Sequence, residues 1–499
     1  MKPPAVLTFL RALRRTGALH PRPVRSSLSL LLDVLRHGPS LYALVRWQAR
    51  RQPAAPAVVW GDLHLGYGAL LDRADTLAAR LPTRSRRGAV GVLDGDPLLT
   101  LLALLACGHL GCRVLPLSPR LGPQAVRAVQ DRERLDILLC PDALLAAYPD
   151  AIPLRLDGPP ATRPARRGRA RAGQLGLLTS GSTGRPRVIR RPGRGPALMT
   201  LAALLDTLPL RAGMGAVLPL PLSHGHGLAF LGTCLLLGAR LRLLHAPTPG
   251  QLWGALHEPG AEVVTLVPTQ LHRLMSTPWP RPAGLRSVLC GSGPLDAALA
   301  GRTLAHLGPV LFNQYGTTET GPLALATPAD LLAAPGSVGR VLPGVPLSVQ
   351  EDAVTLCTPG GPLRTGDLGH LDGQGRLWLR GRADHLIVTG GENLNPEALE
   401  ARLRAWPYVQ DCAVQGLPDA EYGQRLRAFV VLDDPADLAR FQADCRAQLP
   451  RAHRPREVHV VPALPRTDAG KLLRGDLERL LPTPDAPVRA AGRAARSPA

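Results

Sequence analysis

The sequence contains almost no lysine. Lysine occupies only positions 2 and 471 of the 499 residues, although lysine and arginine together number 59. A coding bias toward G and C accounts for the general scarcity, because it favours arginine codons, but it does not account for the exception. Lysine carries a compact charge on a flexible stem, whereas arginine is a rigid planar fork. We therefore expect Lys471, in "PRTDAGKLLR" (465–474), to have a chemical role.

Aromatic residues are also rare, at 3% of the chain. Proteins that bind single-stranded nucleic acid stack bases on aromatic side chains, so this class is disfavoured. The sequence has no basic recognition helix and no zinc-finger spacing, so a nucleic-acid partner would rest on charge alone and is not expected. The net charge of +21 still predicts anionic partners, among them nucleotides, a cofactor phosphate or an anionic membrane surface.

Paired cysteines and long apolar runs are missing as well. None of the eight cysteines forms a C-x-x-C pair, which predicts reduced, buried thiols in a cytoplasmic protein. The most apolar segment, "PLLTLLALLACGHLG" (97–111), is too short to span a membrane and predicts a buried helix. Arg11, Arg14 and Arg15 interrupt the apolar stretch at the N-terminus, so no secretory signal is expected.

Apolar strands that alternate with helical segments predict an α/β protein. The stretch 89–119 is typical of a strand–helix–strand unit, which implies a parallel sheet covered on both faces. Further apolar strands at 215–222, 262–268, 287–293 and 309–316 end in small or polar residues. Binding sites of open α/β sheets collect beyond the carboxyl ends of such strands.

The pattern divides the chain into a large N-terminal multi-sheet α/β domain and a small α+β C-terminal domain. We expect a basic N-terminal extension at 1–40, the large domain at 41–382, the small domain at 383–480 and a disordered tail at 481–499. Within the extension, residues 27–38 are predicted to form an amphipathic helix that either contacts a membrane surface or stays solvated.

Three stretches carry residues suited to binding a nucleotide, although each alone also fits an ordinary loop or turn. "LLTSGSTGRPR" (177–187) places glycines and hydroxyls where they can surround a polyphosphate, but it lacks the Walker A spacing. "NQYGTTETG" (313–321) offers a tyrosine to stack on a base and Glu319 to hold a hard cation such as Mg²⁺. "RTGDLG" (364–369) places an aspartate in a tight turn, where its carboxylate can accept two ribose hydroxyls.

Together with further segments in the same order, these stretches resemble the adenylate-forming superfamily of acyl-CoA synthetases, luciferases and peptide-synthetase adenylation domains. The other matching segments are "PLPLSHGHGL" (219–228), "VLCGSGPL" (288–295), the stretch 365–403, "GLPDAEYGQRLRAFVVL" (416–432) and "LPRTDAGKLLR" (464–474). The resemblance covers roughly residues 41–480, and "TGALHPRP" (16–23) is similar to the start of certain bacterial fatty-acyl-CoA synthetases.

The resemblance implies a two-step reaction that uses ATP, Mg²⁺ and coenzyme A. A carboxylate attacks the α-phosphate of ATP to give acyl-AMP and pyrophosphate, and the thiol of coenzyme A then displaces AMP. Lys471 matches the family lysine that bridges the carboxylate and the α-phosphate, where positive charge is needed between two anions. The other implied catalytic residues are Thr318 at the α-phosphate, Glu319 as the Mg²⁺ ligand, and His224 between the acyl pocket and the nucleotide.

The same likeness implies the residues that bind the rest of the nucleotide and coenzyme A. Tyr315 would lie against adenine, and Asp367 would bind the ribose. The implied ATP- and AMP-binding set is Thr179, Ser180, Gly181, Ser182, Thr183, Gly184, Arg187, Gly291, Ser292, Gly293, Asn313, Tyr315, Gly316, Thr317, Asp367 and Arg382. Asp384 matches the hinge about which the small domain, as a mobile lid, rotates between the two steps, and Gly390, Gly391 and Glu392 match the segment presented to coenzyme A.

Several positions depart from the family pattern. Arg187 stands where most members have lysine and Val188 where glycine is usual, which puts the closed pose of the phosphate loop in doubt. Val388 occupies a place often held by lysine, and the stretch 346–364 is shorter than usual. We expect the chemistry to be retained. His226 we interpret as a bystander, because H-x-H supplies only two of the ligands that a metal site needs.

The apolar pocket segments and the N-terminal likeness predict a medium- or long-chain fatty acid as substrate, with an aryl acid as the alternative. No aspartate stands in "PLSHGHGLAF" to bind an amino group, and only a short tail follows residue 480, so neither an amino-acid substrate nor a carrier domain is expected. An enzyme that passes acyl-AMP to a carrier protein and a catalytically degenerate nucleotide-binding scaffold stay open. A serine hydrolase is disfavoured because no G-x-S-x-G occurs. We expect a cytoplasmic location, and peripheral contact with the inner membrane face stays open.

Overall fold

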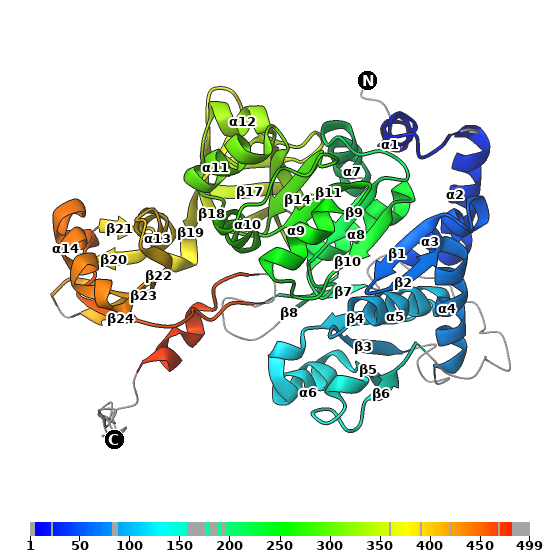
Figure 1. Ribbon diagram of the computed structural model, residues 1–499, viewed down its shortest axis with the longest axis horizontal. Coiled ribbons are helices and arrows are strands. Elements are labelled where there is room, and N and C mark those ends of the chain that lie inside the picture. The colour runs from blue at the N-terminus through cyan, green and yellow to red at the C-terminus, as the bar shows by residue number, and fades with distance from the viewer. Residues whose placement is uncertain are drawn as a thin grey trace, which may run out of the picture. The chain divides into compact units, whose positions relative to one another are not determined.

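The computed structural model describes residues 5–20, 23–81, 88–156, 175–179, 187–190, 196–358, 361–389, 392–419, 421–467 and 470–481. Two compact units make up the chain (Figure 1). The larger unit comprises Met1–Asp384 and Thr467–Lys471, and the smaller one comprises His385–Arg466 and Leu472–Ala499. The loop that carries Lys471 therefore groups with the larger unit, although the sequence on both sides of it groups with the smaller one.

A nine-stranded sheet forms the centre of the larger unit, and its six middle strands are parallel. Its strand order is β15 (Arg340–Val341), β14 (Gly321–Ala326), β13 (Leu311–Thr317), β12 (Ser287–Gly291), β11 (Ala261–Leu266), β9 (Gly215–Leu218), β10 (Arg240–Leu243), β1 (Pro56–Trp60) and β2 (Leu63–Gly66). Strands β9, β11 and β12 are buried along their whole length, as their mainly apolar sequences require in a sheet covered on both faces.

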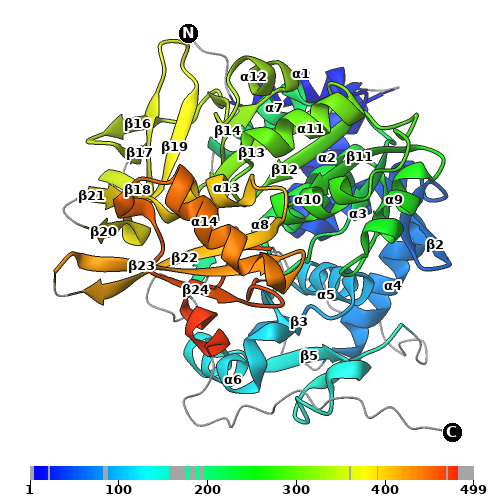
Figure 2. The same ribbon diagram turned by 60° about the vertical axis from the view of Figure 1, so that its left-hand side comes forward.

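Helices cover the two faces of this sheet differently. Val264 and Val288 pack with α9 (Pro249–His257), α10 (Pro268–Ser276) and α11 (Ala297–Leu307) on one face, where Figure 2 shows α10 and α11 across the strands. Val263 and Leu289, which adjoin Val264 and Val288 on the same strands, pack with α7 (Pro196–Thr207) and α8 (Gly225–Leu237) on the other face. Successive side chains of a strand point to opposite faces, which explains the alternation.

A second, smaller parallel sheet completes the α/β part of the larger unit. Its order is β4 (Arg113–Leu117), β3 (Ala89–Leu93), β5 (Ile137–Pro141) and β6 (Ile152–Leu154). The predicted buried helix is confirmed as α5 (Pro97–Leu110), all of whose residues are buried. The helices α3 (Leu41–Arg51), α4 (Tyr67–Arg80), α6 (Gly122–Glu133) and α12 (Pro328–Ala333), and the short hairpin of β7 (Gly176–Thr179) with β8 (Arg187–Arg190), complete the α/β elements.

The N-terminal segment contributes two helices to the larger unit. Helix α1 (Ala5–Arg15) packs against α7, and its residues Ala12 and Leu13 lie in the main core. Helix α2 (Pro23–His37) packs against α3. Helix α1 therefore contributes to the core of the larger unit.

Antiparallel strands follow the large sheet in the sequence. They form a four-stranded sheet in the order β16 (Leu347–Gln350), β17 (Ala353–Thr358), β18 (Gly361–Leu371) and β19 (Leu377–Arg382). The smaller unit has its own sheet, of β21 (Glu392–Leu394), β20 (Ile387–Thr389), β23 (Gly423–Leu432), β22 (Val409–Asp419) and β24 (Glu457–Val460), with helices α13 (Pro396–Arg404) and α14 (Leu438–Gln448). Its core is separate from that of the larger unit.

Seven of the eight cysteines are buried, as predicted, and Cys357 is not. All eight lie in described ranges and are free thiols. Within the described ranges, no helix combines the length and the apolar character needed to cross a bilayer. Residues 482–499, most of the predicted tail, lie outside the described residues.

Candidate functional site

The predicted site residues gather where neighbouring strands of the large sheet end. Strand β12 ends at Gly291, which pairs with Gln314 on β13, and Tyr315 follows directly. His224 stands at the N-cap of α8, in the loop after β9. That loop is fixed from the smaller sheet, because Asp94 at the end of β3 accepts a hydrogen bond from the backbone N–H of Ser223, with N and Oδ2 2.6 Å apart. The carboxyl edge of the sheet thus holds the predicted nucleotide-binding turns together.

Tyr315 and Asp367 meet although they are far apart in the sequence. The Tyr315 hydroxyl donates to Asp367 Oδ2 over 2.6 Å, and its ring packs against Val354 and Leu377 of the antiparallel sheet. Asp367 pairs across β18 and β19 with Arg382, whose Nη1 lies 3.6 Å from Asp367 Oδ1. The three side chains form a cluster of an aromatic ring, a carboxylate and a guanidinium, which suits a base, ribose hydroxyls and a phosphate.

Burial dominates the electrostatics of this cluster. Burial raises the pKa of Asp367, and the hydrogen bond from Tyr315 and the charges of Arg382 and Lys471 oppose that rise. The pKa of Tyr315 is raised by burial and by the neighbouring Asp367 carboxylate. The hydrogen bond of Arg382 to Asp384 raises the pKa of its guanidinium. Hydrogen-bond donors therefore favour the ionised form of Asp367 against the effect of burial, and ribose hydroxyls would be further donors of this kind.

A glycine is required beside Asp367. Gly366 has φ +84°, in the left-handed region that side chains rarely adopt. A Cβ at this position would also lie 2.7 Å from Nη2 of Arg382. The glycine therefore lets the turn bring the Asp367 carboxylate close to the guanidinium.

The loop of Lys471 reaches the same cluster. Thr467 closes the loop by donating its backbone N–H to the Lys471 carbonyl over 2.8 Å, while its Oγ1 accepts from the Lys471 N–H over 3.0 Å. Gly470 has φ +74°, and a Cβ there would collide with the side chain of Thr269 at the start of α10. The exposed ammonium of Lys471 is close enough to Asp367 to lower its pKa. The one internal lysine is thus placed beside the predicted ribose-binding carboxylate.

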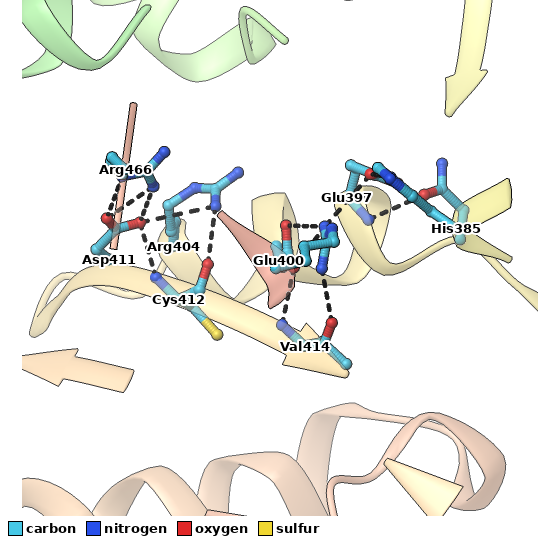
Figure 3. Close-up of polar contacts among 10 residues, drawn as sticks. His385, Glu397, Glu400, Arg404, Asp411, Cys412, Val414 and Arg466 are labelled. Atoms are coloured by element: carbon cyan, nitrogen blue, oxygen red, sulfur yellow. Dashed lines mark hydrogen bonds and ion pairs between the residues drawn. The ribbon is translucent and has the colours of Figure 1, made fainter. Parts of the chain in front are cut away.

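Two arginines in the smaller unit flank this loop and form ion pairs that the sequence analysis did not foresee. Figure 3 shows Arg466 facing Asp411, with Nη2 at 2.7 and 2.8 Å from the two carboxylate oxygens. Arg474 binds the carboxylate of Glu400 at 2.9 Å and that of Glu397 at 3.3 Å. Glu400 is almost fully buried, so burial raises its pKa and the charge of Arg474 opposes the rise. These contacts anchor the chain on both sides of Thr467–Lys471.

His226, interpreted as a bystander, lies in a hydrogen-bonded chain at the glycine turn. The Thr265 hydroxyl donates to the Leu289 carbonyl, so its oxygen is left to accept from Nε2–H of His226, 2.8 Å away. Nδ1 of the neutral ring then accepts from the Ser292 hydroxyl over 3.1 Å. Ser292 itself has φ +67°, in the left-handed region. The histidine therefore fixes the hydroxyl of a residue predicted to lie beside adenine.

The pH dependence of stability tests this environment. Desolvation lowers the pKa of His226 to about 4, from an ordinary value of 6.5. Between these pH values the unfolded chain takes up a proton that the folded chain excludes, so stability falls as pH drops from 6.5 toward 4. We expect His226→Gln to flatten this fall by up to about 3 kcal/mol, measured as the melting temperature from pH 4.5 to 7.5. The exposed His245→Gln is the control, and an equal change in both variants would contradict the assignment.

An apolar cavity adjoins the hydrogen-bonded residues Thr265, His226 and Ser292. It lies between the large sheet and helices α7 and α8. The space between its walls amounts to about 460 Å³ when the part open to solvent is included. Leu204, Leu208, Phe230, Val263 and Leu289 give it apolar walls, and His226, Thr233, Ser287 and Gln314 supply the polar groups. The cavity follows one face of β12 away from the glycine turn.

Ser287 is the unusual member of this lining. Its side chain is fully buried, and its Oγ has no hydrogen-bond partner among the described residues. Ser287 and Gly291 begin and end β12, so they lie about 13 Å apart on the same strand face. A buried hydroxyl without a partner is costly unless a ligand completes it. The far end of the cavity is therefore suited to a hydrogen-bonding group.

Other predicted residues are placed only in part. Thr179 and Arg187 pair at the base of the β7–β8 hairpin, whereas Ser180, Gly181, Ser182, Thr183 and Gly184 lie outside the described residues. Gly390 and Gly391 also lie outside the described residues, and Glu392 is exposed on β21. Their predicted roles toward phosphates and coenzyme A therefore remain predictions.

The turn after β13 holds the predicted cation ligand. Thr318 and Glu319 lie in this turn, Glu319 is exposed, and the Thr317 and Thr320 hydroxyls are 3.0 Å apart. Asn313 is buried on β13, and its Oδ1 has no hydrogen-bond partner in the described part of the chain. No group of three metal-binding side chains occurs among the described residues. A single carboxylate fits Mg²⁺ that is bound mainly through nucleotide phosphates.

Family models match most of the chain. The model of the AMP-binding enzyme family matches residues 45–383, and that of the AMP-binding enzyme C-terminal domain matches residues 398–471. The chain belongs to the AMP-binding enzyme family. It is thus an adenylate-forming protein of the acyl-CoA synthetase type, which confirms the resemblance found in the sequence.

Curated relatives of this chain are named as acyl-CoA synthases or acid–CoA ligases. Feruloyl-CoA synthase of Amycolatopsis sp is 29% identical, over 87% of this chain and 97% of the relative. The 2-succinylbenzoate–CoA ligase of Bacillus licheniformis is 27% identical, over 87% of this chain and 98% of the relative. The fold matches the solved structure of o-succinylbenzoate CoA synthetase from Bacillus subtilis with its acyl-adenylate intermediate, at a TM-score of 0.77 and 23% identity, over 87% and 97% of the two chains.

Sequence reasoning missed the residues whose importance lies in their partners. Ser287 and Thr265 sit within apolar strands, where a lone hydroxyl gives no signal of a cavity. Arg466 and Arg474 are two arginines among many in a chain that uses arginine for almost every positive charge. Only their closeness to Lys471 in the sequence could have drawn attention to them.

Proposed function

We propose that this chain is an ATP-dependent acid–CoA ligase. A carboxylic acid attacks the α-phosphate of ATP, so that an acyl–phosphate bond forms and pyrophosphate leaves. The thiol of coenzyme A then attacks the acyl carbon, and AMP leaves with the formation of a thioester. The observation that carries the proposal is that the Lys471 loop belongs to the same unit as the hydrogen-bonded Asp367 and Tyr315, where the charge of Lys471 acts on the Asp367 carboxylate.

The cluster supplies what the first step needs. Two anions must approach each other, and the flexible ammonium of Lys471 places one positive charge between them in the transition state. Asp367 holds the ribose hydroxyls, and Tyr315 presents its ring to the base. Arg382, 3.6 Å from Asp367, adds positive charge near the ribose and phosphate. His224, Thr318 and the glycine turn at Gly291 keep the roles that the resemblance implies.

Mg²⁺ would be held by Glu319 together with phosphate oxygens of the nucleotide. The ion, when bound, supplies positive charge to those oxygens. The exposed carboxylate of Glu319, in a turn between two paired strands, is free of any ion pair in the described part of the chain and suits this use.

An aromatic acid is the substrate that we place first. The relatives named above act on feruloyl and succinylbenzoyl groups, and the cavity lining combines apolar walls with a few polar groups. The unpartnered hydroxyl of Ser287 favours an acid with a hydroxyl or carbonyl at its far end. The medium- or long-chain fatty acid predicted from the sequence remains the second candidate, because the remaining walls are apolar.

Pyrophosphate release from ATP and Mg²⁺ tests the proposal. Matched pairs of acids, cinnamic with 4-hydroxycinnamic acid and octanoic with 8-hydroxyoctanoic acid, would be assayed with and without coenzyme A, and hexadecanoic acid would be added for chain length. We expect acid-dependent release, and thioester only when coenzyme A is present. Acyl-AMP that is formed but not transferred to coenzyme A would favour a carrier protein as acceptor. Nucleotide binding without any acid-dependent release would favour a scaffold instead.

Replacing Ser287 tests the acid preference. Ser287→Ala removes the hydroxyl that would pair with the far end of the acid, so we expect kcat/KM to fall about 10–100-fold for the hydroxylated acid of the preferred pair. The unsubstituted partner should be used as well or better. Ser337→Ala is the matched control, because Ser337 is also a buried serine with an unpartnered hydroxyl but lies outside the cavity. Equal losses for both acids would contradict a role in selection.

A further inference from the structure

Helix α2 exposes a continuous apolar stripe. The side chains of Val24, Leu28, Leu31, Leu32 and Leu35 recur at helical spacing, and their exposed fractions are 82%, 55%, 52%, 39% and 52%. Residues three and four apart lie on one face of a helix, so the five form a single band along the whole length of α2. Figure 1 shows α2 on the outside of the larger unit, next to α3.

The face of α2 that packs against the protein is polar. Ser26, Asp33 and His37 are 7%, 0% and 2% exposed, with Leu30 as the buried apolar residue between them. A surface helix ordinarily turns its apolar face to the core and its polar face to water. Helix α2 instead turns most of its apolar side chains outward, so its exposed leucines gain little from the fold of this chain.

Specific contacts hold the helix in this orientation. The buried Asp33 carboxylate lies 3.2 Å from Nη1 of Arg50 and 3.7 Å from Nε of Arg46, both on α3. Trp47, also on α3, donates its indole N–H to the Ser26 carbonyl over 3.2 Å and to the Ser29 hydroxyl over 3.0 Å. Rotation of α2 to bury the leucines would break these contacts and leave two arginines without their buried counter-charge. The exposure of the stripe is therefore built into the packing.

Charge beside the stripe selects the kind of partner. Arg25 and Arg36 are exposed on α2 next to the leucines, and Arg11, Arg14 and Arg15 are exposed on α1. An apolar band flanked by arginines is the pattern of helices that lie in the interface of an anionic membrane. A second copy would bring the same positive charges against these, in a chain whose net charge is +21. One helical stripe is also narrow for a stable dimer, which buries about 1,200–2,000 Å².

We propose that α2 docks this protein on the surface of an anionic phospholipid bilayer. The band from Val24 to Leu35 enters the boundary between headgroups and acyl chains, and Arg25 and Arg36 pair with lipid phosphates. The helix stays attached to α3 through its polar face and does not span the membrane. This docking is independent of the proposed reaction, since no residue of the nucleotide cluster or the cavity lies on α2.

Co-sedimentation of the full chain with vesicles tests the proposal. Vesicles of phosphatidylcholine alone would be compared with vesicles that contain phosphatidylglycerol, at low and high salt. We expect binding to the anionic vesicles, and we expect Leu28→Gln/Leu31→Gln/Leu35→Gln to weaken it on the order of 10²-fold. Glutamine keeps a high helix propensity, so the helix should persist. Arg25→Gln/Arg36→Gln should weaken binding to anionic vesicles and reduce its salt dependence, without touching the leucines.

A matched control is available elsewhere on the surface. Leu332, Leu363 and Leu371 are 64%, 42% and 40% exposed outside α2, and their triple replacement by glutamine should leave vesicle binding unchanged. Equal loss in the two triple variants, or no binding by the native chain, would overturn the proposal. Light scattering provides a further test. If the native chain is a dimer that does not bind vesicles, and the α2 triple variant is a monomer, then a second copy covers the stripe and the proposal is overturned.

Discussion

Replacement of Lys471 by alanine should lower acid-dependent pyrophosphate release on the order of 10²–10³-fold, the usual effect of removing one transition-state charge partner. The loop of Thr467–Lys471 packs with the larger unit, and the ammonium lies near Asp367. Its charge is needed only while the carboxylate and the α-phosphate approach each other. We therefore expect kcat to fall more than the KM for ATP rises.

Two further variants make this prediction specific. Lys2→Ala removes the only other lysine and should leave the rate unchanged. Lys471→Arg keeps the charge but replaces a flexible ammonium with a rigid fork, so it should recover only part of the activity. Transfer from preformed acyl-AMP to coenzyme A should be much less affected by Lys471→Ala, because that step no longer joins two anions. Retention of pyrophosphate release within a few-fold would exclude Lys471 from the first step.

Replacement of Arg474 by alanine should strongly destabilise the smaller unit. The guanidinium is bound to two carboxylates, and the side chain of Glu400 is only 5% exposed. Removing one partner leaves a buried charge unpaired. We expect the free energy of unfolding to fall by about 3 kcal/mol, the lower end of the range for buried pairs, because the Arg474 side chain is 22% exposed.

The pH dependence and a nearby control distinguish this loss from a general surface effect. Burial already raises the pKa of Glu400, and loss of Arg474 should raise it further. Protonation relieves the unpaired charge, so the deficit should grow as pH rises from 5 to 7.5. Arg479→Ala, on the same short helix, breaks an ion pair in which Arg479 is 81% exposed and should cost little. Urea unfolding and hydrogen exchange of residues 385–481 would measure both. Equal effects of the two variants would contradict the buried role of Arg474.

A second change should repair part of the damage. Glu400→Gln in the Arg474→Ala chain replaces a buried carboxylate by a neutral amide, which costs less to bury. The amide can still accept the Val414 backbone N–H, which now donates to Glu400 Oε1 over 2.8 Å. We expect the double variant to be more stable than Arg474→Ala at pH 7.5. A further loss would mean that packing, rather than the unpaired charge, causes the defect.

The sequence alone was sufficient to predict the repeating patterns of strands and helices and the site residues that lie within a single motif. Mainly apolar runs identified β11 and β12, because strands of a covered parallel sheet are rich in apolar residues. Tyr315 and Asp367 could each be chosen from their own motif, but their 2.6 Å contact joins two sheets and could not be derived from either motif. The amphipathic character of α2 was also predictable, whereas the direction of its apolar face was not. The helical spacing of apolar residues shows that the two faces of α2 differ in polarity. Only the ion pairs of Asp33 show that the polar face is the one that packs against the protein.

The hydroxyls and arginines were missed for a related reason. Their effect depends on what does or does not surround them, and this is a property of distant segments. Ser287 is ordinary in a strand until the structure shows that its Oγ lacks a partner at the cavity wall. Arg474 is one of many arginines until Glu397 and Glu400 are found around it. His226 was set aside for lack of further metal ligands, although hydrogen bonds to Thr265 and Ser292, rather than a metal, connect it to the site.

Because lysine is so scarce, a lysine-specific protease can be used to report on the closed loop that carries Lys471. A lysine-specific endoprotease has only two peptide bonds to attack in 499 residues, and the second of them follows Lys471. To cut there, it must draw Thr467–Lys471 away from Thr269. The rate of cleavage after Lys471 would therefore report the rate at which the loop opens, without any label or substitution. Bound nucleotide would be expected to slow this cleavage.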